Sequence, residues 1–175
     1  MAGPVVEELA RATEPWRNAY ADSVALSTAV LFLHLAALVV GAGLALAADR
    51  GTLRSWRAPV AERARHLAEL SLTHRPVVTA LGVLFASGVL LFLSDVEVYA
   101  TSAVFWTKMT LVALLLANGY AMTRAEAALT RVHAGESNEP AAADHRLWRR
   151  LRALATASAA LWLVTLLAGT ILASQ

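Results

Sequence analysis

The chain has 175 residues, of which 58% are hydrophobic and only 16% are charged, with a formal net charge of +2. This apolar share is well above that of a soluble domain, so the composition argues against a water-soluble globular protein. The chain has no cysteine, which excludes disulfides, iron–sulfur clusters, thiolate zinc sites and covalent c-type haem attachment. It also lacks a continuous basic stripe with interleaved aromatic residues, so we expect no nucleic-acid partner.

The first 22 residues are polar and mixed in charge, and Trp16 and Tyr20 suit a membrane interface. We interpret residues 1–22 as an amphipathic lead-in on the outer surface and not as a signal peptide. Four charge-poor segments follow, at about 23–48, 76–98, 100–123 and 150–173. Each has close to the 17–25 residues that cross a bilayer, and only helices satisfy their own backbone groups in lipid. The sequence therefore predicts an all-α integral membrane four-helix bundle, with residues 23–175 as a single domain of two antiparallel hairpins.

The first apolar segment contains one histidine, His34, about 16 Å from its start at 1.5 Å per residue. Ser27, Gly41 and Ala45 lie at offsets of −7, +7 and +11 from it, so all four share one helix face. That face is small and weakly polar, which predicts that His34 points into the bundle. A neutral imidazole bonded to a neighbouring helix is one interpretation; a haem ligand, metal ligand or proton carrier is the other.

The short connection before the third segment carries Asp95 and Glu97, and the third segment contains Lys108. Lys108 lies seven positions after Thr101, about 10 Å deep. Its ammonium could extend to the surface toward Asp95 or Glu97, or it could anchor an anionic group such as a propionate or a quinone oxygen. Asn118, ten residues further on, is expected to make an interhelical hydrogen bond next to this site.

Arginine is concentrated in the two long connections. Residues 49–75 and 123–152 hold six arginines each, whereas the connection between the second and third segments holds none. Because arginine-rich loops stay on the cytoplasmic side, both termini are predicted to face outward. We expect a multi-pass protein of a bacterial-type inner (cytoplasmic) membrane, in contact with the lipid bilayer.

One histidine in the first membrane helix and one lysine in the third form a recognisable pair. The stretches "LHLAALVVGAGLALAADR" and "FWTKMTLVALLLANGYAMTR" carry His34 and Lys108. Together they resemble the four-helix membrane superfamily that contains HemJ-type protoporphyrinogen oxidases and the membrane domain of CopD-type copper proteins. The resemblance covers residues 23–173. It implies that His34 and Lys108 are the functional residues and that haem b is an associated cofactor.

These observations lead to one hypothesis and two alternatives. The first is a redox-linked membrane protein that binds haem, porphyrin or quinone between its helices. In this protein His34 would be either a ligand, for example of a haem iron, or a proton relay. Lys108 would pair with an anionic substituent. The second is a non-catalytic subunit or assembly factor that packs against other membrane subunits, or a homo-oligomer. The third is a small transporter of copper or protons. The sequence assigns no reaction.

Overall fold

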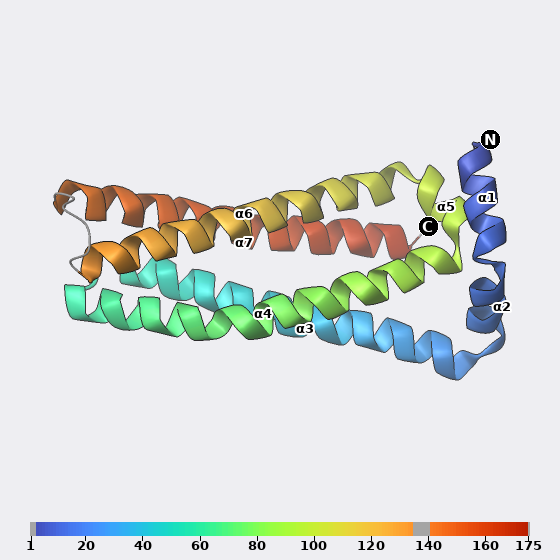
Figure 1. Ribbon diagram of the computed structural model, residues 1–175, viewed down its shortest axis with the longest axis horizontal. Coiled ribbons are helices and arrows are strands. Elements are labelled where there is room, and N and C mark those ends of the chain that lie inside the picture. The colour runs from blue at the N-terminus through green and yellow to red at the C-terminus, as the bar shows by residue number, and fades with distance from the viewer. Residues whose placement is uncertain (1–2, 135–140, 175) are drawn as a thin grey trace.

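The computed structural model describes residues 3–134 and 141–174, and in this part of the chain seven helices follow one another (Figure 1). Four of them are long: α3 (Val24–Ser55), α4 (Val60–Ser94), α6 (Ala103–His133) and α7 (Ala141–Ala173). Three are short: α1 (Pro4–Ala12), α2 (Glu14–Asp22) and α5 (Val96–Thr101).

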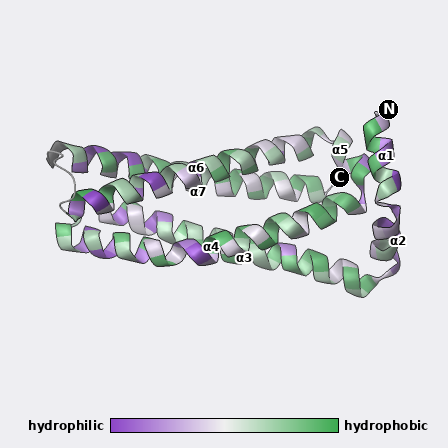
Figure 2. Ribbon diagram, in the orientation of Figure 1, coloured by the Kyte–Doolittle hydropathy of each residue, from purple (hydrophilic) through white to green (hydrophobic). Residues whose placement is uncertain are grey.

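All four long helices are long and apolar enough to cross a membrane. The prediction of an all-helical chain with four membrane-crossing helices is therefore confirmed, by length and composition, for the described residues. Figure 2 shows the hydrophilic residues concentrated toward the end of the bundle where α3 meets α4 and α6 meets α7.

The helices extend beyond the apolar segments from which they were predicted. α4 begins at Val60, sixteen residues before Pro76, and these sixteen residues add about 24 Å of helix at 1.5 Å per residue. α6 likewise continues to His133. A hydrocarbon layer about 30 Å thick is shorter than these helices, and we call their arginine-rich ends the projecting end.

This projecting end contains the main hydrophobic core of the described chain. Its members come from α4, α6 and α7: Leu67, Leu70, Met122, Ala125, Leu129, Trp148, Leu151 and Ala155. Trp148 and Leu151 are 1% and 0% exposed.

In the apolar half, the helices associate through small residues. A Cβ atom added at Gly41 of α3 would lie 3.3 Å from the Cβ of Ala80 of α4, so the absence of a side chain at Gly41 allows the two helices to approach closely. Such close approach is a main source of helix association in lipid. The most extensive contacts join α3 to α4 and α6 to α7, and α3 also packs on α7. By contrast, α4 and α6 touch at few positions.

The short helices lie across the end opposite the arginine-rich connections (Figure 1). α2 contacts α3 and α4, and α1 contacts α5. The indole nitrogen of Trp16 donates a hydrogen bond to the Leu90 carbonyl at 3.0 Å, which fixes α2 against α4. Ser23 and Ser102 cap the starts of α3 and α6 at this end by accepting hydrogen bonds from backbone N–H groups.

Candidate functional site

His34 of α3 is half-buried and points toward α4. Its Nδ1 atom lies 3.1 Å from the hydroxyl oxygen of Ser87, and the Leu84 carbonyl is a second polar neighbour of the ring. A Cβ atom added at Gly88 would lie 3.3 Å from Cε1 of His34. The ring therefore packs against a position of α4 that has no side chain, beside a serine that can bond to it.

The contacts around Ser87 favour one tautomer of His34. The Ser87 hydroxyl lies 2.7 Å from the Val83 carbonyl and 3.2 Å from the Leu84 carbonyl, and when its proton is donated to either of them its oxygen is left to accept from the imidazole. Nδ1 consequently carries the hydrogen and Nε2 carries the lone pair. Nε2 takes no part in the contact with Ser87. This leaves the nitrogen able to bind a metal, a proton or a ligand hydroxyl.

Lys108 of α6 is half-buried and lies against α7. A Cβ atom added at Gly169 would lie 3.5 Å from its Nζ atom, so this glycine leaves room for the lysine head group. The positive charge of Lys108 acts electrostatically on the His34 ring. Lys108 forms no hydrogen bond or ion pair with any described residue. The two candidate residues thus lie within electrostatic range of each other, and each retains an unused polar group.

The acidic residues at the connection between α4 and α6 lie apart from Lys108. Asp95 and Glu97 are exposed, and the Asp95 carboxylate accepts a hydrogen bond from the Val98 backbone at the start of α5. Burial, together with the nearby Asp95 and Tyr20, raises the pKa of Tyr99 on the same helix, so its hydroxyl remains protonated. In the described chain neither acid forms an ion pair with Lys108.

Aromatic rings pack beside this outer connection. Phe92 and Phe105 are stacked with ring centroids 5.2 Å apart, and Tyr99 lies 6.5 Å and 5.9 Å from them respectively. Trp106 meets Phe105 edge-on at 5.5 Å. These rings join α4, α5 and α6, and Phe105 lies about one helical turn before Lys108.

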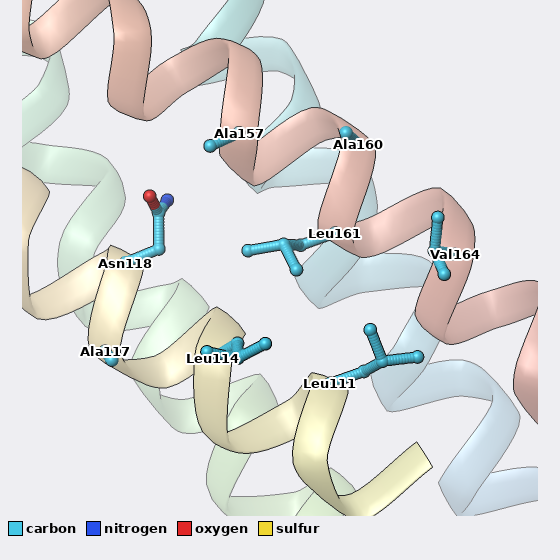
Figure 3. Close-up of a pocket in the computed structure, with 8 residues that line it drawn as sticks. All are labelled: Leu111, Leu114, Ala117, Asn118, Ala157, Ala160, Leu161 and Val164. Atoms are coloured by element: carbon cyan, nitrogen blue, oxygen red, sulfur yellow. The ribbon is translucent and has the colours of Figure 1, made fainter. Parts of the chain in front are cut away.

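Asn118 lies in the groove between α6 and α7, facing Ala157 (Figure 3). Its amide nitrogen donates to the Leu154 carbonyl of α7 at 3.1 Å. This is an interhelical hydrogen bond of the kind expected from the sequence. Asn118 is ten residues from Lys108, about 15 Å along the helix.

The sequence analysis missed a second polar group inside the bundle, where the apolar half meets the projecting half. Asp49 of α3 is 2% exposed, and its Oδ2 atom has no hydrogen-bond partner among the described residues. The Ser158 hydroxyl of α7 is the polar neighbour of this carboxyl. Glu126 of α6 is half-buried and lies within electrostatic reach of Asp49.

A buried hydrogen-bonded pair lies one turn further along α3. The Oγ1 atom of Thr52 is 2.9 Å from Nε2 of His66 in α4, and these residues are 0% and 7% exposed. Gly51 allows this contact, because a Cβ atom there would lie 2.6 Å from Cε1 of His66. The pair fastens α3 to α4 in the projecting end.

One sequence signal could have identified these residues. The face of α3 that carries His34, Gly41 and Ala45 continues with Asp49 and Thr52 at steps of four and three residues. Asp49 was instead assigned to a polar loop, because the apolar segment stops at residue 48. Helical periodicity followed past the apolar segment would have placed both residues inside the bundle.

The fold and these groups define a class: the chain is an all-helical protein with four helices suited to crossing a membrane and a small number of polar side chains between them. No protein-family model, curated protein or solved structure matches it.

Proposed function

We propose that this chain is a multi-pass protein of a bacterial-type inner membrane, arranged as two antiparallel hairpins with both termini outside. The arginines of residues 49–75 and 123–152 support this orientation, since such residues stay on the cytoplasmic side. The contacts of α3 with α4 and of α6 with α7 support the pairing. The projecting core around Trp148 would then lie in the cytoplasm.

We propose further that the protein binds a redox-active ligand, a haem, a porphyrin or a quinone, through His34 and Lys108. The observation that carries this proposal is the state of His34, whose Nδ1 is held by Ser87 while Nε2 remains available near an unpaired ammonium. Metal-binding histidines typically donate their other ring N–H to a protein group in this way. The HemJ-type resemblance of the same pair supports the same assignment.

The residues present fit a haem through a single protein ligand. His34 is the only one of the five histidines on the outer side of the bundle, so one chain would supply one axial imidazole. Among the described residues, no three His, Asp or Glu side chains gather as a metal-binding group, which favours a haem, porphyrin or quinone over a bare copper ion. When bound, such a group would supply one-electron redox chemistry.

The chain's own residues would bind, orient and shield this ligand. Ser87 would orient the His34 ring through its contact with Nδ1. The Lys108 ammonium would neutralise a propionate or donate to a quinone oxygen, since no side chain of the described residues pairs with it. The ligand would enter where α4 and α6 have few contacts, between the two hairpins. The aromatic group around Phe105 would limit the access of water from outside.

Ligand content after purification tests this proposal. Wild-type protein and the His34→Ala and Leu33→Ala variants are purified in mild detergent, and the visible spectrum and the extracted quinone are measured. Leu33 is the matched control, because it neighbours His34 and is 51% exposed. We expect a Soret band or a stoichiometric quinone in the wild type and in Leu33→Ala, and its loss in His34→Ala.

Two results would contradict the proposal. Equal ligand content in all three proteins would remove His34 from the site. A folded wild-type protein with neither pigment nor quinone, purified together with a stoichiometric membrane partner, would favour the non-catalytic subunit instead.

A further inference from the structure

A groove runs along one face of the α6–α7 pair, and it has two parts of different chemistry. The outer part has a volume of about 530 Å³ and is apolar, lined mainly by Leu111, Leu114, Leu161 and Val164 (Figure 3). The inner part has a volume of about 400 Å³ and contains Arg124, Arg131 and Arg150, with Tyr120 and Leu147 beside them.

The two parts lie on the same face of both helices. On α6, Leu111 and Asn118 line the outer part, and Ala125 of the same heptad series lines the inner part. On α7, Val164 lines the outer part and Arg150, fourteen residues earlier, lines the inner part. A spacing of seven residues is close to two helical turns, so these residues follow one line along each helix. The two parts are therefore successive sections of one groove.

The arginines of the inner part have charge available for a ligand. Arg124 contacts the Tyr120 hydroxyl at 3.4 Å, and Arg131 donates to the Ala127 carbonyl at 3.3 Å. All three arginines are exposed, and none of them forms an ion pair with a carboxylate of the described chain. Three unpaired guanidinium groups around one hollow give it a strong preference for an anion.

The position of Arg124 along the membrane normal matches a lipid head group. Arg124 lies sixteen residues after Lys108, or about 24 Å along α6. Since Lys108 is about 10 Å below the outer boundary, Arg124 is about 34 Å from that boundary and just beyond a hydrocarbon layer about 30 Å thick. The apolar part of the groove then lies at the depth of acyl chains.

We propose that this groove binds one anionic phospholipid, with its phosphate against Arg124, Arg131 and Arg150 and an acyl chain along Leu114 and Leu161. Guanidinium groups bind phosphate oxygens in a bidentate manner, and basic hollows between membrane helices on the cytoplasmic side suit such head groups. The continuous apolar section distinguishes this ligand from free phosphate. A zwitterionic lipid is disfavoured, because its ammonium would meet three positive charges. The proposal uses neither His34 nor Lys108, so it stands or falls separately from the redox proposal.

Native mass spectrometry of the full chain from mixed vesicles tests the proposal. The probe is phosphatidylglycerol in an excess of phosphatidylcholine. The groove variant is the triple substitution Arg124→Gln, Arg131→Gln and Arg150→Gln. The matched control is Arg54→Gln, Arg65→Gln and Arg149→Gln, which removes the same charge from exposed arginines outside the groove. Thermal unfolding establishes that both variants are folded.

We expect the wild type to retain one phosphatidylglycerol in preference to phosphatidylcholine. That preference should fall about tenfold or more in the groove variant, because the guanidinium–phosphate contacts are lost, and about twofold or less in the control, because only general surface charge is lost. Ala157→Phe, which fills the apolar section, should also release the lipid while leaving every arginine in place. Equal loss in both triple variants would reduce the effect to general surface charge and overturn the proposal. Full retention in Ala157→Phe, or displacement of the lipid by millimolar inorganic phosphate, would also overturn it.

Discussion

Substitution of Gly51 by alanine should destabilise the protein more than any glycine substitution in the apolar half of the same helix. The added Cβ would lie 2.6 Å from Cε1 and 3.2 Å from Nδ1 of His66. The ring cannot move away freely, because it is 7% exposed and bonded to Thr52 at 2.9 Å. Either the two helices separate slightly, or the buried hydrogen bond breaks.

The expected size follows from three terms. Alanine gains about 1 kcal/mol over glycine in helix propensity. Overpacking costs about 1–3 kcal/mol. A buried partner left without its hydrogen bond costs about 1–3 kcal/mol more. The free energy of unfolding should therefore fall by about 1–5 kcal/mol, and because about 1 kcal/mol shifts the midpoint by 2–4 °C in a chain of this size, Tm should fall by about 2–20 °C.

Gly43→Ala is the matched control. Gly43 is also in α3, and no atom lies within 4 Å of its added Cβ, so only the propensity gain applies. Thermal unfolding followed by circular dichroism in detergent compares the two variants. If Gly51→Ala melts at or above the temperature of Gly43→Ala, the packing described for His66 against α3 is wrong.

Three further predictions concern charge and topology. Asp49→Asn should raise Tm by a few degrees at neutral pH, because Asp49 is 2% exposed with an unpartnered Oδ2; a fall in Tm in the same melting assay would mean that the carboxylate has a stabilising partner. Lys108→Met and Lys108→Arg should both reduce ligand content at matched expression. The first removes the cation, and the second places a wider planar group in a confined space. Full retention of the ligand in both variants would mean that Lys108 is only a tolerated charge. In this cysteine-free chain, Thr130→Cys should resist a membrane-impermeant thiol reagent in intact cells, whereas Ser174→Cys should react, and the reverse pattern would invert the topology.

The apolar half of the fold could be predicted closely from the sequence, because lipid imposes a simple requirement on composition and length. Segments 23–48 and 100–123 lie within α3 and α6 apart from their first residues. The helical offsets of Gly41 and Ala45 from His34 also describe a face turned toward the bundle.

The projecting half could not be predicted in this way. Its helices are polar on the outside, and what holds them is a core around Trp148 that forms only when α4, α6 and α7 come together. The polar contacts between helices could not be predicted from the sequence either. Ser87, which orients His34, is 53 residues away in the sequence, and nothing local in the sequence distinguishes it from other serines. Pairing across helices is a property of the packed structure and not of any single segment.

The most direct measurement of the central claim is the ¹⁵N spectrum of the His34 imidazole in protein labelled with ¹⁵N-histidine. The signals of His34 are those missing from His34→Ala, and spectra are recorded before and after extraction of the bound ligand. The account predicts that Nδ1 is protonated in both samples and that the Nε2 resonance shifts or broadens only in the presence of the ligand. An Nε2 resonance that does not change on extraction, or a ring protonated on Nε2 with a bare Nδ1, would contradict a ligand site at His34.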